Sequence, residues 1–133
     1  MKVIVDTCIW SLALRRNGNK SDPAVISLTE LINDSRVQMI GPIRQEILSG
    51  IKSETKFKTI SKIVRAFPDI SLEIDDYELA ARFYNLCRGK GVQGSNTDFL
   101  ICAVSFRHKM PIFSNDKDFL HYKKHLKIEL FQI

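Results

Sequence analysis

The sequence predicts an α/β fold in which helices cover a mostly parallel sheet. Short apolar runs rich in valine and isoleucine alternate with longer segments of helical periodicity along the 133 residues. Such runs are typical of strands that are buried on both faces, and alternating strands and helices favour an α/β sandwich. The chain has about the length of one domain, with 44% apolar and 26% charged residues. We therefore expect a single domain over residues 1–133.

In the first half of the chain, proline and glycine mark where helices begin and end. Asp22 precedes Pro23, and an aspartate before a proline is a typical helix start. Pro42 and Gly50 bracket an apolar pattern of period four in the same way. We expect strands over residues 2–5 and 37–40, helices over residues 7–16, from residue 23, over 42–49 and over 54–66, and a turn in the sequence NGNKSDP (17–23).

In the second half, the sequence DDYELAARFYNLCRG (75–89) predicts a long helix. Asp75 and Glu78 have the spacing of a capping box, and Gly89 is the predicted C-cap. The segment DFLICAVSFRH (98–108) is apolar nearly all round, which predicts an interior helix with Asp98 in its first turn. We expect strands over residues 70–74, 111–114 and 128–133 and a short helix around 116–126.

The net charge and the cysteine content limit the kinds of partner and the kinds of site that we expect for this protein. The net charge of +5 favours a polyanionic partner. Cys8, Cys87 and Cys102 are odd in number and form no CxxC pair, so we expect buried thiols rather than a disulfide framework or a zinc ribbon. No apolar run approaches the roughly 18 residues of a membrane span, and the N-terminus lacks a signal-like segment. We expect a cytoplasmic protein with no membrane contact.

Two apolar runs at opposite ends of the chain are each followed by an aspartate, Asp6 and Asp116. Because the carboxyl ends of parallel strands share one edge of a sheet, we expect both aspartates at that edge. Asp98 points to the same edge from the start of the interior helix. Glu46 borders the buried stripe of its own helix and reaches the edge if that helix packs alongside.

Carboxylates gathered in one place imply a cation. They repel one another and raise one another's pKa unless a positive charge neutralises them. Hard oxygen ligands favour Mg²⁺, with Mn²⁺ as the alternative, over zinc. Each acid also has a simpler explanation, as a helix cap or a solvated strand end.

Four short acidic motifs resemble those of PIN-domain nucleases, in the same order and at similar intervals. They are VIVDTCIW, the glutamate of PIRQEIL, GSNTDFLICAVS and IFSNDKDF. The chain is most similar to the VapC-type ribonuclease toxins of prokaryotic toxin–antitoxin pairs, and the resemblance covers essentially its whole length. It implies a PIN-like α/β/α sandwich with a mostly parallel central sheet. It also implies an endoribonuclease, a hydrolase that cleaves RNA phosphodiester bonds with Mg²⁺ or Mn²⁺.

The resemblance implies a role for each motif acid. Asp6 would be the central metal ligand and Asp98 the second, while Glu46 and Asp116 would complete the set directly or through water. A metal-bound water would attack phosphorus in line. Asp118 is a rival to Asp116 as the fourth acid. Residues beside the acids would orient carboxylates or waters, and these supporting residues are Thr7, Asn96, Ser114 and Asn115.

The resemblance also implies partners, namely a second copy of the chain in a homodimer and a small antitoxin protein whose tail would block the acidic site. Trp10, Leu12 and Leu14, with the apolar residues of the helices between Pro42 and Phe67, are candidate surfaces for them. Core packing explains the same residues equally well.

Other chemistries fit the sequence less well. The segment GKGVQGS follows a helix rather than a strand and departs from the P-loop pattern, so we predict a helix end and a loop. His121 and His125 have i, i+4 spacing but no third zinc ligand near them. A haloacid-dehalogenase-like phosphatase needs a second aspartate two residues after the first, where Cys8 stands. The alternative function is a catalytically silent RNA- or partner-binding module on the same fold, and the four intact acids argue against it.

Overall fold

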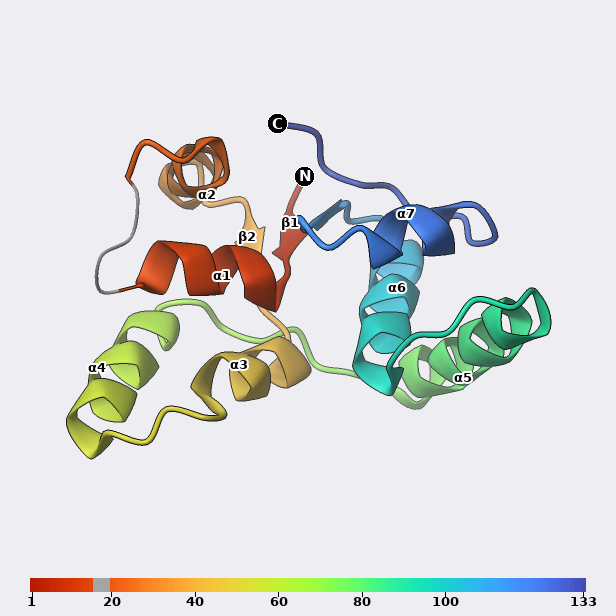
Figure 1. Cartoon of the computed structure of the whole chain (residues 1–133), viewed down its shortest axis with the longest axis horizontal. Helices are drawn as coiled ribbons and strands as arrows, with labels where there is room; N and C mark the ends of the chain where they lie inside the picture. Colours follow the sequence, from red (N-terminus) through yellow and green to blue (C-terminus); the bar gives the residue numbers. More distant parts are fainter. Residues whose placement is uncertain (16–19) are drawn as a thin grey trace.

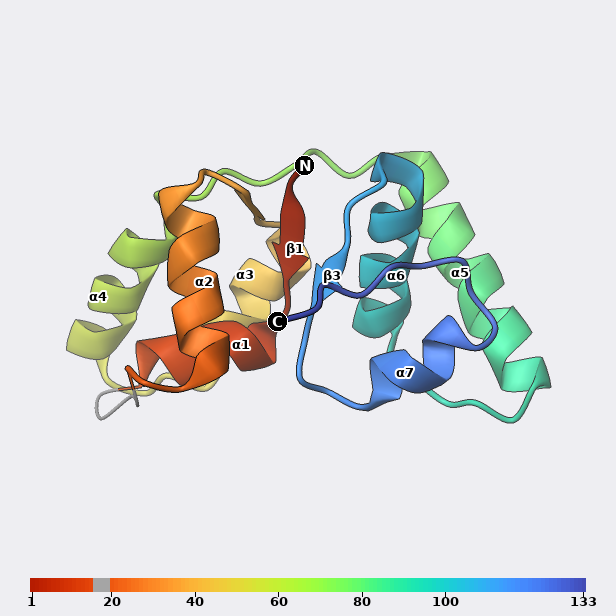
Figure 2. The ribbon, with the colours of Figure 1, turned by 90° about the horizontal axis from the view of Figure 1, so that it is seen from above.

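The computed structural model describes residues 1–15 and 20–133, and in these ranges three short strands form a parallel sheet. The strands are β1 (Val3–Val5), β2 (Val37–Gln38) and β3 (Ile112–Phe113), in the order β2-β1-β3. Val3 pairs with Val37, and Ile4 pairs with Ile112. β1 is therefore the central strand, and the carboxyl ends of all three strands lie at one edge, the lower edge in Figure 2.

Both outer edges of the sheet end in a single bridge where strands were predicted. The prediction of a strand over residues 70–74 is wrong: Asp69 bridges Met39, the Ile70 N–H donates to the Met39 carbonyl at 3.1 Å, and a helix begins at Ile74. The predicted strand over residues 128–133 is likewise reduced to a bridge between Leu130 and Ile112. The physical reason is that β2 and β3 are each two residues long, so a strand beside either of them finds few backbone N–H and carbonyl groups to pair with.

The helices of the first half begin within one residue of their predicted starts. They are α1 (Thr7–Leu14), α2 (Pro23–Asn33), α3 (Gly41–Leu48) and α4 (Glu54–Val64). Asp6 caps α1 and Asp22 caps α2, each by accepting a backbone N–H. α1 ends at Leu14 with Arg15 as its C-cap, two residues before the predicted end at residue 16, and the start of the predicted turn over 17–23 lies outside the described residues.

The helices of the second half are α5 (Ile74–Gly89), α6 (Asn96–His108) and α7 (Asp118–Lys123). The predicted capping box is wrong by two positions, because it joins Glu73 and Asp76 rather than Asp75 and Glu78. The Asp76 carboxylate accepts the Glu73 backbone N–H at the start of α5 and is also paired with Arg107 of α6. Gly89 is the last helical residue and not the C-cap, which is Lys90.

The helices lie on both sides of the strands, which confirms the predicted α/β sandwich. Figures 1 and 2 both show α1, α2 and α4 on one side and α5, α6 and α7 on the other. The three residues of β1 are fully buried, and α6 is buried continuously from Phe99 to Ser105, as its apolar sequence predicts. Cys87 and Cys102 are buried free thiols, and Cys8 is half-buried. None of the helices within the described ranges is long and apolar enough to cross a membrane.

An ion pair joins α5 to α6. The carboxylate of Asp76 is fully buried, and its Oδ1 accepts a hydrogen bond from Arg107 at 2.7 Å. Burial alone would raise the pKa of Asp76, but the Glu73 backbone N–H and the Arg107 guanidinium stabilise the charged form, and the pKa lies below its usual value. Asp76 thus stabilises the fold above its unfolded-state pKa, and this contribution is lost as the pH falls through the lowered pKa.

Asp76→Ala should lower the free energy of unfolding by roughly 3 kcal/mol at neutral pH, because it removes the buried partner of Arg107 and leaves only the exposed Asp75 near that charge. This value lies at the lower end of the range for buried ion pairs, since the Arg107 side chain keeps access to water. Urea denaturation at pH 7 measures the loss, and the difference from the wild type should shrink at about pH 3. Asp75→Ala is the matched control, because Asp75 is exposed and its loss should cost less than about 1 kcal/mol. Equal losses for the two variants would contradict the buried pair.

Candidate active site

Asp6 stands where β1 ends and α1 begins, and both of its carboxylate oxygens are held. Oδ1 accepts the Thr7 backbone N–H at 2.8 Å, which makes Asp6 the cap of α1. Oδ2 accepts the Ser114 hydroxyl at 2.8 Å, from the end of β3. Asp6 is 7% exposed. Its carboxylate is therefore fixed in direction by two neighbouring elements.

Ser114 links Asp6 to Asp116. The Ser114 hydroxyl oxygen accepts the Asp116 backbone N–H at 3.0 Å, and Asp116 Oδ1 accepts the Asp118 backbone N–H at 2.9 Å. The turn after β3 is held by these two bonds. The half-buried Cys8 thiol lies against the same link, with its sulfur 3.6 Å from Asp6 Oδ2 and 3.4 Å from the Ser114 hydroxyl.

Asp98 lies in the first turn of α6 and faces the other acids. Its backbone N–H donates to the Ser95 hydroxyl at 3.1 Å, and its Oδ2 accepts the Tyr122 hydroxyl at 2.6 Å. Partial burial raises the pKa of Asp98, and the charges of Asp6 and Asp116 add to the rise, while the Tyr122 hydrogen bond opposes it. Tyr122 was not among the predicted site residues, because an aromatic residue three positions after Phe119 in a helix predicts only core packing.

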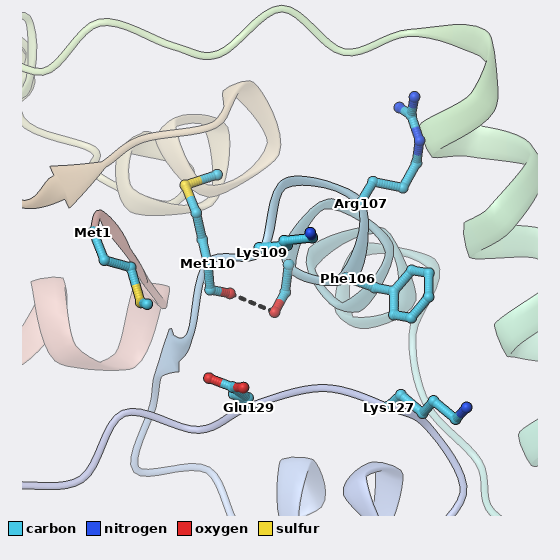
Figure 3. A pocket seen from close by; sticks show the side chains of 8 residues that line it. Met1, Phe106, Arg107, Lys109, Met110, Lys127 and Glu129 are labelled. Carbon is cyan, nitrogen blue, oxygen red and sulfur yellow. Dashed lines mark hydrogen bonds between the residues drawn. The ribbon is translucent and has the colours of Figure 1, made fainter.

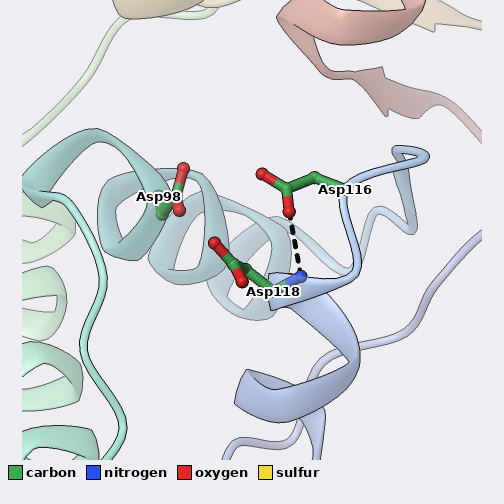
Figure 4. Close-up of side chains that lie close together, drawn as sticks. All are labelled: Asp98, Asp116 and Asp118. Carbon is green, nitrogen blue, oxygen red and sulfur yellow. Dashed lines mark hydrogen bonds between the residues drawn. The ribbon is translucent and has the colours of Figure 1, made fainter.

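Asp98, Asp116 and Asp118 form an acidic cluster at the carboxyl edge of the sheet (Figure 4). One carboxylate oxygen from each residue lies within 4.8 Å of the others. The structure thus brings Asp116 and Asp118 to the same place, so both fit the fourth motif position. The donors are carboxylate oxygens alone, which suits a hard divalent cation such as Mg²⁺ or Mn²⁺.

Glu46 joins the site through Thr7. The Thr7 hydroxyl donates to Glu46 Oε1 at 2.7 Å, so α3 lies alongside the edge as the prediction required. Glu46 is exposed and stands beside Asp6 rather than within the acidic cluster. Asn96 is exposed at the first position of α6, and the backbone of Asn115 hydrogen-bonds to the Cys8 sulfur. The catalytic and supporting roles of all these residues remain a prediction.

A hollow of about 530 Å³ lies at the opposite end of the strands (Figure 3). Met1, Phe106, Lys109, Met110 and Lys127 line it, and Glu129 is its one carboxylate. A single carboxylate among cationic and apolar side chains is a poorer match to a hard divalent cation than a group of three carboxylates. The acidic cluster is therefore the better candidate for the active site.

Comparison with known proteins agrees with this geometry. The sequence matches the PIN domain family over residues 3–125. The chain belongs to the PIN-domain family. It is 32% identical over 124 residues to VapC ribonuclease Mb1587 of Mycobacterium bovis and to ribonuclease VapC11 of Mycobacterium tuberculosis, covering 88% of each chain. The predicted membership in this family is thus confirmed.

Solved structures share the fold of this PIN domain at low sequence identity. FitAcB from Neisseria gonorrhoeae is 17% identical, with a TM-score of 0.78 over 98% of this chain and 96% of that chain. VapBC2 from Rickettsia felis, bound to a DNA fragment from their promoter, is 16% identical with the same TM-score over 98% of both chains. These likenesses confirm a PIN-like α/β/α architecture.

The acidic cluster should destabilise this PIN domain when no cation is present. Two unit charges about 4 Å apart in water repel by roughly 1 kcal/mol, so Asp116→Asn and Asp118→Asn should each raise the free energy of unfolding by up to about that amount in EDTA. Adding Mg²⁺ should stabilise the wild type more than either variant. Thermal unfolding with and without Mg²⁺ measures both effects.

Glu129→Gln is the matched control, because it removes one negative charge at the far end of the sheet. It should leave the response to Mg²⁺ unchanged. A wild-type response in Asp116→Asn and in Asp118→Asn would show that neither carboxylate contributes to cation binding.

Proposed function

We propose that this PIN domain is an endoribonuclease that depends on Mg²⁺ or Mn²⁺. The observation that carries the proposal is the acidic cluster at the carboxyl edge of the sheet, with Asp6 held beside it. Support comes from the relatives at 32% identity, which are named as ribonucleases. The net charge of +5 suits an RNA backbone, through contacts that weaken with salt.

In this proposal Asp98, Asp116, Asp118 and Asp6 would hold the cation. When bound, a divalent cation supplies positive charge that polarises the phosphodiester and acidifies the attacking water. Ser114 keeps the Asp6 and Asp116 segments in register, and Thr7 holds one oxygen of Glu46 by a hydrogen bond. Among the described residues no partner binds the other oxygen of Glu46, which would accept the proton that water loses. Positioned groups of this kind do not have to reorganise during the reaction.

Cleavage of labelled RNA by the purified chain tests the proposal, with Mg²⁺, Mn²⁺ or EDTA. Asp6→Asn and Asp98→Asn should each lower the rate about a hundredfold or more, since even outer partners of metal ligands contribute about 10–100-fold. Both variants keep the shape of the side chain, and Glu129→Gln is the control of equal charge change. Cutting in EDTA would contradict the proposal. RNA binding without cutting under either metal would favour the silent binding module instead.

We also propose an antitoxin protein as a partner. An apolar hollow of about 760 Å³ lies between α1, α2 and α4, and it is lined by Trp10, Ile26, Ile63 and Phe67 among others. Ile26 and Ile63 are more than 40% exposed, which is costly for a surface that nothing covers. An apolar helix of the antitoxin fits such a groove.

Ile26→Glu and Ile63→Glu should abolish co-purification with the antitoxin while the chain stays folded. Ile74→Glu on α5 is the matched control, because Ile74 is exposed outside the hollow. Undiminished co-purification of both hollow variants would exclude this surface. The homodimer stays a prediction, and light scattering of the purified chain measures the molar mass that tests it.

A further inference from the structure

A buried tyrosine holds one oxygen of the Asp98 carboxylate. Tyr122 belongs to α7 and is fully buried, and its hydroxyl donates to Asp98 Oδ2 at 2.6 Å. A tyrosine hydroxyl is protonated at neutral pH, and a carboxylate can only accept, so Tyr122 is the donor in this hydrogen bond.

Aromatic packing fixes the Tyr122 ring. Its centroid lies 4.9 Å from that of Phe99 and 5.3 Å from that of Phe119. Phe99 follows Asp98 directly in α6, so the same helix supplies the carboxylate and the ring that orients its donor. The hydroxyl is therefore held against Asp98 by packing and not only by the hydrogen bond.

Gly94 makes the room that the Tyr122 hydroxyl occupies. A Cβ atom at this position would overlap the Tyr122 hydroxyl and would lie 2.9 Å from Phe99 Cε2. Gly94 is not among the glycines with positive φ, so the need is for space and not for backbone freedom. The adjacent Ser95 caps α6 by accepting the Asp98 N–H. The Gly94-Ser95 pair thus places both the backbone and the carboxylate of Asp98.

We propose that Tyr122 is a positioning residue that orients Asp98 for cation binding and that Gly94 is the residue that permits this contact. The inference rests on the proposed function. With Oδ2 held by Tyr122, rotation of the Asp98 carboxylate is restricted, and its direction relative to Asp116 and Asp118 is set before a cation arrives (Figure 4). Outer partners of this kind typically change metal affinity about 10–100-fold.

Tyr122→Phe tests the inference, because it removes the hydroxyl and keeps the ring. Mn²⁺ affinity is measured without RNA, from the electron paramagnetic resonance signal of free Mn²⁺. We expect about tenfold weaker binding with little change in melting temperature. In RNA cleavage, the half-saturating Mn²⁺ concentration should rise by the same factor while the rate at saturating Mn²⁺ is largely kept.

Tyr84→Phe is the matched control. Tyr84 packs on the same Phe99 ring at 5.6 Å, but its hydroxyl accepts from Arg88 and touches none of the acids. It should bind Mn²⁺ as the wild type does. Equal weakening in both variants would show a general effect of the aromatic packing and would overturn the positioning role.

Gly94→Ala is an independent test that leaves the Tyr122 hydroxyl present but displaces it. As a single substitution it should weaken Mn²⁺ binding. Combined with Tyr122→Phe it should weaken Mn²⁺ binding little further, because the hydroxyl is already gone. If Tyr122→Phe fails to fold, Gly94→Ala decides the question in the same assay. Wild-type Mn²⁺ affinity in a folded variant overturns the inference and leaves the proposed function intact. Absence of Mn²⁺ binding by the wild type overturns both.

Discussion

The hydrogen bond from Ser114 to Asp6 is the contact on which the arrangement of the site depends. These residues lie 108 positions apart, and only the parallel pairing of β1 with β3 brings them together. The same hydroxyl accepts the Asp116 N–H, so one side chain holds the ends of two strands and the turn that carries the last acids. A shift in the register of β3 would move Asp116 and Asp118 together, because the turn is tied to that strand.

Negative charges repel one another in the acidic cluster, whereas between α5 and α6 a negative charge is paired with a positive one. At the carboxyl edge, three aspartates stand close enough to repel one another, and Asp98 is partly buried as well. On the helices behind them, a fourth aspartate, Asp76, is buried and yet stabilising because Arg107 neutralises it. The contrast lies in the neutralising partner, because the Arg107 guanidinium brings positive charge to Asp76 whereas the three clustered aspartates repel one another. Functional clusters of this type are commonly kept at a cost in stability.

The similar structures show that the arrangement of strands and helices in a PIN domain tolerates wide differences in sequence. At 16–17% identity most side chains differ, but the TM-score of 0.78 shows that the strands and helices keep their arrangement. Side chains such as Tyr122 and Gly94 then adjust the site within that arrangement. Variation in how Asp98 is held would change cation affinity without changing the fold.

The sequence by itself determined the local features of this protein. The cap at Asp22, the apolar α6 and the three central strands follow from side-chain chemistry within a few residues, so they could be predicted. Tertiary structure decided what depends on distant contacts. The outer predicted strands are single bridges because their neighbours are short, and the capping box joins Glu73 to Asp76, whose carboxylate also pairs with the distant Arg107. The sequence motif includes Asp118, but only the fold brings its carboxylate close to that of Asp98. Tyr122 joins the site only through the packing of α7 against α6, a contact that no local pattern encodes.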